Sequence, residues 1–323
     1  MIMAKTARNI ESSMLAVRDG VNAALDGIDR EIFNFSLFPA AFIGKAVRAR
    51  FTLLLARALS LDARQGVKLA VAAELAHTAS LLHDDCIDMA RCRRGHPTLN
   101  ARLGVNAAIL VGDLVIALAF DLAATISPDL GRELVLAVKH MTEGALLEEN
   151  MRGSKISADT AARIVTLKTG ALFRWCALAA ASLAGRRELL EPCANIGSQT
   201  GCAFQVTDDA LDFDGDPGQC GKEVLKDISA GKFTLPLILA MNDPAAGPRA
   251  AALAAELAKG PTADLAPALA LAALVKEGGF TTAARNSALE RIKTLTPLID
   301  ALPDRDGALE LKGFLLALVK RTR

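Results

Sequence analysis

Apolar residues recur along almost the whole chain at three- and four-residue spacing. The runs Val67–Leu82, Asn106–Ala124 and Ala161–Leu183 show this spacing most clearly. Such a period places apolar side chains on one face of an α-helix. Alanine and leucine dominate these runs, and both residues favour helix. No segment shows the alternation and paired turns of a sheet, so the pattern predicts an all-α protein.

Short breaks rich in glycine, proline and aspartate separate the helical runs. They lie at Gly95–Pro97, Ser127–Asp129, Asp212–Lys222, Asp243–Pro248 and Gly260–Pro261. Helices joined by short connections pack as antiparallel neighbours. Although a length of 323 residues would also allow two domains, no long linker divides the chain. We therefore expect residues 1–323 to form one large antiparallel helical bundle.

The charge balance excludes one broad class of partner. Lysine and arginine together number 37, aspartate and glutamate 36, and the net charge is +1. A nucleic-acid-binding protein normally carries a basic excess, so we expect no nucleic-acid partner. Any charge that matters for function must be arranged locally.

The high apolar content, 52% of residues, raises the question of a membrane. A spanning helix needs about 20 apolar residues in a row. The three longest candidates are interrupted or bounded by charge: Val105–Ala119, Trp175–Gly185 and Leu265–Val275. We expect all three to be short, buried helices, with no transmembrane segment. The first 30 residues contain no secretory signal, so the predicted location is cytoplasmic.

Two acidic segments stand out against this apolar background. The first aspartate motif, Asp84–Asp88, and the second, Asp208–Asp212, both read DDxxD and both follow an apolar run. Residues four apart lie on one face of a helix, so the first and last aspartates of each motif point the same way. Carboxylates that close repel each other unless a cation lies between them. Magnesium prefers oxygen ligands and shares them with phosphate, so two opposed motifs would cradle a magnesium diphosphate.

Acidic clusters are also common as solvated helix ends, and a lone DDxxD is weak evidence. Here the motifs directly follow the apolar segments Ala79–Leu82 and Cys202–Phe204, where exposed acids are not expected. Two copies in this setting favour a metal site.

Basic residues follow each aspartate motif in the sequence, and further ones lie beside apolar stretches elsewhere in the chain. Arginine offers forked donors and lysine a point charge, and a diphosphate suits both. Each residue alone is more often a surface charge, but together they explain how a neutral chain could hold a polyanion. The set comprises Lys45, Arg48, Arg93, Arg94, Lys168, Lys222 and Lys232.

Several motifs in a fixed order resemble the polyprenyl diphosphate synthase family of the class I isoprenoid synthase fold, and its long-chain members most. The resemblance extends from Gly44 to about Pro236. It rests on the segments His77–Asp85, Arg93–Thr98, Val111–Asp113, Lys168–Leu172, Phe204–Asp209 and Gly221–Pro236. This ordered set is far more specific than either DDxxD alone.

The resemblance implies a helical bundle with a central active-site cavity. It implies an enzyme that uses magnesium, three ions per active site, to join isopentenyl diphosphate to an allylic diphosphate. Ionisation would leave an allylic carbocation, the alkene would attack it, and a proton would then be lost. The family also suggests a homodimer.

Residue roles follow from the same resemblance. The implied metal-binding aspartates are Asp84, Asp88, Asp208 and, through water, Asp212. The allylic diphosphate would be held by Arg93, Lys168, Lys222 and Lys232, and isopentenyl diphosphate by Lys45, Arg48, His77 and Arg94. Thr169 and Gln205 would line the place where the carbocation forms. Catalytic roles accordingly fall to Lys168, Thr169, Gln205 and Arg93.

Two segments depart from the family pattern. The family commonly reads GGKRxRP near the start, whereas this chain reads IGKAVRA at 43–49. Because Lys45 and Arg48 remain, we expect the isopentenyl site to be kept with altered affinity. Leu225 stands where glycine is usual, which affects the loop that carries Lys222.

Small residues precede the first aspartate motif and bear on product length. Ala76, Ala79 and Ser80 lie where a growing prenyl tail would pass, and farnesyl-forming relatives tend to place an aromatic residue there. We therefore expect a long product, hexaprenyl to decaprenyl. The alternative is that the alanines only let helices pack closely, which would leave a geranylgeranyl or farnesyl product.

Three other readings stay open. A class I terpene cyclase shares the fold but needs no isopentenyl site. A non-catalytic partner subunit of a heteromeric prenyl synthase tends to lose its aspartates, which this chain keeps. A plain helical scaffold explains none of the ordered motifs.

Overall fold

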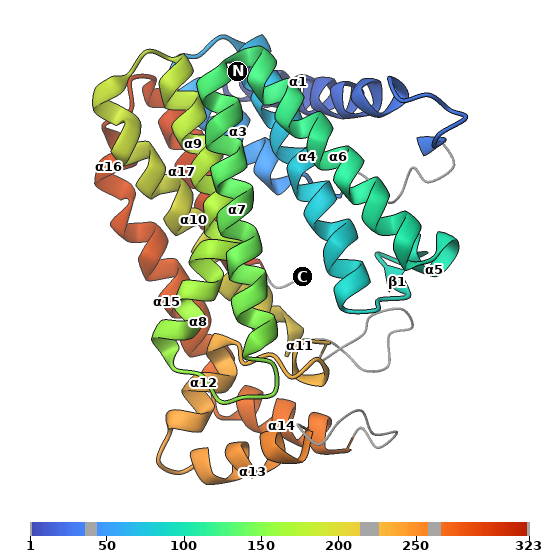
Figure 1. Ribbon diagram of the computed structural model, residues 1–323. Helices are drawn as coiled ribbons and strands as arrows, with labels where there is room; N and C mark the ends of the chain where they lie inside the picture. Colours follow the sequence, from blue (N-terminus) through green and yellow to red (C-terminus); the bar gives the residue numbers. More distant parts are fainter. Residues whose placement is uncertain (1, 36–43, 214–225, 258–265, 322–323) are drawn as a thin grey trace. The chain divides into compact units, whose positions relative to one another are not determined.

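The computed structural model describes residues 2–35, 44–213, 226–257 and 266–321 (Figure 1). Over these residues the chain is helical apart from one small hairpin, which confirms the all-α prediction. The helices are α1 (Ile2–Asp26), α3 (Val47–Ala58), α4 (Ala63–Ile87), α5 (Leu99–Leu103), α6 (Val105–Ile126), α7 (Pro128–Asn150), α8 (Ala158–Val165), α9 (Ala171–Leu183), α10 (Leu190–Asp212), α11 (Lys226–Ser229), α12 (Leu235–Asn242), α13 (Gly247–Leu257), α14 (Ala266–Glu277), α15 (Phe280–Thr294), α16 (Thr296–Asp300) and α17 (Arg305–Lys320).

Shorter elements complete the description. A π-helix, η2 (Thr166–Gly170), continues α8 into α9, and a 3-10 turn, η3 (Arg187–Leu189), precedes α10. The hairpin consists of β1 (Cys92–Arg93) and β2 (His96–Pro97), which pair antiparallel. The helical periodicity did not predict either the π-helix or the hairpin.

The chain divides into two compact units. The first comprises residues 1–138, 172–197 and 297–312, and the second residues 139–171, 198–296 and 313–323. All five boundaries fall inside helices, namely α7, α9, α10, α16 and α17, rather than in loops. That residues 1–323 act as a single domain stays a prediction.

Helix α4 is the centre of the first unit, where α1, α3 and α6 pack against it. Its start is fixed by Asp62, whose carboxylate accepts hydrogen bonds from the backbone N–H groups of Arg64 and Gln65 at 3.0 and 3.3 Å. Leu69 and Ala76 are among the many side chains of α4 that are completely buried. A helix that is apolar on nearly every side belongs in a core, and α4 carries the first aspartate motif at its C-terminal end.

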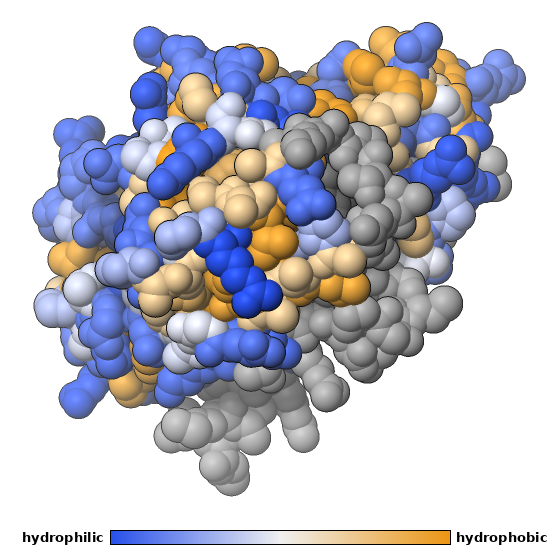
Figure 2. Space-filling view, turned by 90° about the horizontal axis from the view of Figure 1, so that it is seen from below, coloured by the Kyte–Doolittle hydropathy of each residue, from blue (hydrophilic) through white to orange (hydrophobic). Residues whose placement is uncertain are grey.

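The second unit has its own apolar core, formed by α10 to α15. Its deeply buried large side chains include Phe213, Ile228, Leu237, Leu271 and Val275. The face in Figure 2 carries hydrophobic residues among hydrophilic ones, as is usual for protein surfaces.

The expectation that residues 105–119 form a short, buried helix is wrong. Asp113 does not interrupt it, and α6 runs unbroken for 22 residues with a mean hydropathy of 2.2 and only 28% of its most apolar window buried. By length and composition α6 could cross a membrane. Residues 158–183 meet the same criteria, but 61% of their window is buried, as in a core helix. The exposed apolar face of α6 therefore needs an explanation.

Candidate functional site

The C-terminal end of α4 and the hairpin after it hold the first aspartate motif. Arg94 and Gly95 form the two-residue turn of the hairpin, with φ of 53° and 79°. Positive φ at both central residues is the geometry that suits the twist of a tight hairpin. Arg93 pairs with His96 across the turn. The turn directs the neighbouring side chains of Arg93 and Arg94 to different surroundings.

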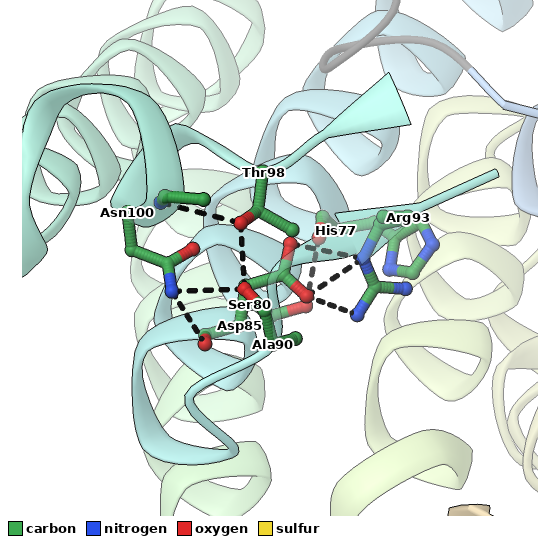
Figure 3. A network of polar contacts seen from close by, with 8 residues as sticks. His77, Ser80, Asp85, Ala90, Arg93, Thr98 and Asn100 are labelled. Atoms are coloured by element: carbon green, nitrogen blue, oxygen red, sulfur yellow. Dashed lines mark hydrogen bonds and ion pairs between the residues drawn. The ribbon is translucent and has the colours of Figure 1, made fainter. Parts of the chain in front are cut away.

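Arg93 is held by Asp85, the middle aspartate of the first motif (Figure 3). Its Nε donates to both carboxylate oxygens at 2.9 and 3.0 Å, and its Nη2 donates to Oδ1 at 2.7 Å. Asp85 is only 4% exposed. The forked pair raises the pKa of Arg93 against the opposing effect of burial. Asp85 therefore positions Arg93 and is enclosed by the protein.

Two polar side chains fasten the hairpin and α5 to the end of α4 (Figure 3). Thr98 Oγ1 donates to the Ala90 carbonyl at 2.6 Å, and Asn100 Nδ2 donates to the carbonyls of Asp85 and Ala90 at 3.2 and 3.0 Å. The helix end is thus rigidly tied. Asp84 and Asp88, by contrast, are partly exposed, one helical turn apart.

A cluster of charge lies at the start of α3. Arg48 is buried and its guanidinium lies 5.2 Å from the centre of the Phe173 ring. The buried Glu74 of α4 accepts a 2.9 Å hydrogen bond from the backbone N–H of Ala49 and so caps α3, whose N-cap Ala46 offers no side chain for this. Burial raises the pKa of Glu74, against the lowering effect of Arg48.

His77 and Arg94 belong to the same cluster. Burial lowers the pKa of His77 well below its usual range, and the positive charges of Arg48 and Arg94 lower it further. The Nδ1 atom of His77 is buried without a hydrogen-bond partner among the described residues. The guanidinium of Arg94 packs directly against Gly44. The structure thus brings together Arg48, His77 and Arg94, while Lys45 is exposed beside Gly44.

In the second unit, a chain of hydrogen bonds fixes the middle of the second aspartate motif. Thr169 Oγ1 donates to Gln205 Oε1 at 2.8 Å, and Gln205 Nε2 donates to Asp209 Oδ1 at 2.8 Å. Asp209 is 5% exposed. Burial raises the pKa of Asp209 well above its usual range, and the neighbouring Asp227 raises it further. Asp209 therefore corresponds to Asp85 in being enclosed.

The outer aspartates of the second motif remain partly exposed. Asp212 accepts a 3.1 Å hydrogen bond from the backbone N–H of Asp227. Asp208 forms an ion pair with Arg321, which follows the last helix. The sequence analysis missed Arg321, because 113 residues separate it from its partner.

Glu148 on α7 is a second residue that the sequence analysis missed. Its Oε2 lies 2.7 Å from the Nζ of Lys168 and 3.7 Å from the Nζ of Lys232. Both lysines were predicted to bind the allylic diphosphate, and one carboxylate holds them together. Close approach of α7 to η2 depends on Gly144, since a Cβ there would lie 2.6 Å from the backbone nitrogen of Lys168. No sequence motif pointed to Glu148.

The remaining predicted residues lie either in α4 or outside the described parts of the chain. Ala76 and Ala79 are fully buried in α4, and the Ser80 hydroxyl donates to the His77 carbonyl at 2.7 Å. Lys222 and Leu225 lie outside the described residues.

The aspartate pairs fit magnesium as partial sites. Within the described parts of the chain, no three side chains of His, Cys, Asp or Glu gather closely enough to hold a metal alone. Each motif offers carboxylate oxygens only. Magnesium readily completes such a set with water and phosphate oxygens, so the donor chemistry fits this ion.

Comparison with known proteins identifies the family. Residues 38–267 match the polyprenyl synthetase family, so the chain belongs to that family and is a prenyltransferase by class. It is 33% identical to the all-trans-nonaprenyl-diphosphate synthase (geranyl-diphosphate specific) of Rhodobacter capsulatus, over 81% of this chain and 80% of the relative. It is 37% identical to the octaprenyl diphosphate synthase of Escherichia coli, over 62% of both chains. Component 2 of the heptaprenyl diphosphate synthase of Geobacillus stearothermophilus is 31% identical over 86% of both.

Solved structures agree with this assignment. A decaprenyl diphosphate synthase from Rhodobacter capsulatus has a TM-score of 0.84 and 28% identity, covering 99% of both chains. A polyprenyl synthase from Caulobacter crescentus, complexed with calcium and isoprenyl diphosphate, has a TM-score of 0.81 and 29% identity, covering 95% of this chain and 98% of that one. The predicted isoprenoid synthase fold is confirmed.

Replacing Asp85 with Asn should destabilise the protein through the loss of a buried charge. Removing one partner of a buried ion pair leaves the other uncompensated, and since Arg93 is partly exposed the cost should be about 1–3 kcal/mol. The melting temperature should fall by several degrees, whereas Asp19→Asn, the same change at an exposed position on α1, should leave it unchanged. Equal melting temperatures for the two variants would contradict the role given to Asp85.

Proposed function

We propose that this protein is a magnesium-dependent polyprenyl diphosphate synthase. It would join the C4 carbon of isopentenyl diphosphate to the C1 carbon of an allylic diphosphate. The C–O bond to the allylic diphosphate breaks, a proton leaves the coupled product, and diphosphate is released. The new product is itself an allylic diphosphate, so the reaction can repeat.

One observation carries this proposal: the two aspartate motifs have the same internal arrangement. In each, the middle aspartate is enclosed, Asp85 by Arg93 and Asp209 by Gln205. The first and last aspartates remain partly exposed on one helix face. A motif that merely ended a helix would not need to bury its middle carboxylate. The pattern supports two separate sets of metal-ligand oxygens.

The side chains around the motifs supply the other functions of the reaction. Asp84, Asp88 and Asp208 would hold the magnesium ions, which neutralise the charge that develops on the leaving diphosphate. Lys168 and Lys232, already drawn together by Glu148, would bind the oxygens of the allylic diphosphate. Arg48 and Arg94 would bind the negatively charged isopentenyl diphosphate, because their positive charges lie close together beside His77. Thr169 and Gln205 would present oxygens to the positive charge of the carbocation.

The relatives support the metal and the substrates. The solved Caulobacter structure holds a divalent cation together with isoprenyl diphosphate. A count of three magnesium ions is part of the proposal.

Replacing Asp84 or Asp208 with Asn should lower turnover about a hundredfold or more while leaving the fold intact, because each is proposed to neutralise metal charge. The assay combines purified protein, isopentenyl diphosphate, geranyl diphosphate and magnesium, with products measured by mass spectrometry. Asp159→Asn, at an exposed position in the second unit, is the matched control. Turnover like that of the control at limiting magnesium would sink the metal assignment.

We also propose a long product, since the compared relatives are named as heptaprenyl to decaprenyl synthases. Replacing Ala79 or Ser80 with Phe should shorten the product, because a ring there would block a tail that passes along α4. From Ser80 to Leu69 the helix rises about 16 Å, room for roughly three isoprene units. Ala79 is buried and Ser80 is partly exposed, so Ser80→Phe guards against a folding defect. Wild-type product lengths from both variants would show that the tail takes another route.

We propose further that a second copy of the chain covers the exposed face of α6, which gives the predicted homodimer. Leu110 is 68% exposed there, and an apolar face of this kind usually marks an interface. Leu110→Glu should convert dimer to monomer in sedimentation experiments, while Leu309→Glu, 55% exposed on α17, should not. A wild-type monomer, or a dimer unchanged by Leu110→Glu, would contradict this.

The alternative function is that of a non-catalytic subunit of a heteromeric prenyl synthase, which needs a different partner chain. Turnover by the purified chain alone would exclude it. The cytoplasmic location stays a prediction.

A further inference from the structure

The second aspartate motif contacts a cation from the protein's own C-terminal segment. Arg321 follows helix α17, and its Nη2 donates a short hydrogen bond to Oδ1 of Asp208. Asp208 is the residue to which the proposed function assigns a magnesium ion. The structure pairs the Asp208 carboxylate with Arg321, whereas the proposed chemistry pairs it with a magnesium ion.

The contact is more than a surface ion pair. The side chain of Arg321 is only 16% exposed. The guanidinium also lies over the ring of Phe204, 4.5 Å from its centre. Phe204 and Asp208 are four residues apart and therefore lie on the same face of α10. Stacking on an aromatic face and pairing with a carboxylate together hold an arginine in one orientation.

The geometry leaves the guanidinium incompletely satisfied. Its Nε is buried and has no hydrogen-bond partner among the residues that the structure describes. A buried donor of this kind costs free energy, so the position of Arg321 is a compromise. An arrangement that is held by one carboxylate and one ring, with a donor unsatisfied, is suited to being displaced.

We propose that Arg321 competes with divalent cations for Asp208 and so weakens metal binding at the second aspartate motif. This inference rests on the proposed function. A guanidinium and a metal ion on the same carboxylate repel each other, so a metal ion at Asp208 would favour displacement of the guanidinium. The Arg321 side chain would then change position when the metal binds. Metal affinity would be set in part by a residue at the end of the chain.

The test measures metal binding by the full-length protein, with no substrate. Mn²⁺ is titrated into chelator-treated protein, and free Mn²⁺ is followed by electron paramagnetic resonance. Arg321→Gln should bind Mn²⁺ about three- to tenfold more tightly than wild type, the range expected for a half-buried ion pair. In chelator its melting temperature should fall by a few degrees, because the pair and the stacking contact are lost. Lys320→Gln removes the same charge from an exposed neighbour and should match wild type.

Two further variants separate the possible failures. Asp208→Asn should weaken Mn²⁺ binding, and in its background Arg321→Gln should bring no gain. If Asp208→Asn leaves binding unchanged, the metal assignment of the proposed function fails. If it weakens binding but Arg321→Gln behaves like Lys320→Gln or binds Mn²⁺ less tightly, the competition proposed for Arg321 is wrong. A gain from Arg321→Gln that persists with Asp208→Asn would also overturn it.

Discussion

The burial of charged side chains in an apolar helical protein is the constraint on which the candidate site depends. An ionised group taken out of water costs several kcal/mol unless it is paired or hydrogen-bonded. Several charged residues around the two motifs have such a partner. Asp85 holds Arg93, Glu148 holds Lys168 and Lys232, and Asp208 holds Arg321. These pairs are internal counterions, and under the proposed function substrates or metal ions would compete with them.

The enclosed aspartates of the two motifs lie in different electrostatic surroundings. Asp85 lies against an arginine, which stabilises its negative charge. Burial raises the pKa of Asp209, the nearby carboxylates of Asp227 and Glu148 raise it further, and the hydrogen bond from the Gln205 amide acts in the opposite direction. The same five-letter pattern therefore occurs in two different electrostatic surroundings. In both cases the middle aspartate is enclosed, and the outer two are the ones proposed to bind metal ions.

The sequence predicted much of this arrangement, because helices and their faces follow from local spacing. The runs around α4 and α10 placed each motif near the end of a helix, and the structure has them there. The four-residue spacing also identified the outer aspartates as neighbours. Local spacing could not distinguish the enclosed aspartates from the others, since that depends on partners from other segments. Gln205 precedes Asp209 by four residues in the same helix. Arg93, by contrast, reaches Asp85 only because the chain turns back in the hairpin of β1 and β2.

Other features depend on contacts between distant parts of the chain. Glu148 and Arg321 belong to no motif, and their importance comes from the side chains that they meet. The π-helix at η2 interrupts a run whose periodicity looked purely α-helical. The exposure of α6 was also invisible, because an apolar helix in a core and one at an interface have the same composition.

The central claim is that the outer aspartates bind metal ions while the enclosed ones do not. Anomalous diffraction from crystals grown with Mn²⁺ and inorganic diphosphate tests this most directly. We expect Mn²⁺ peaks about 2.1 Å from carboxylate oxygens of Asp84, Asp88 and Asp208, with Asp85 still paired to Arg93 and Asp209 to Gln205. Mn²⁺ bound to Asp85 or Asp209, or no peak at either motif, would contradict it.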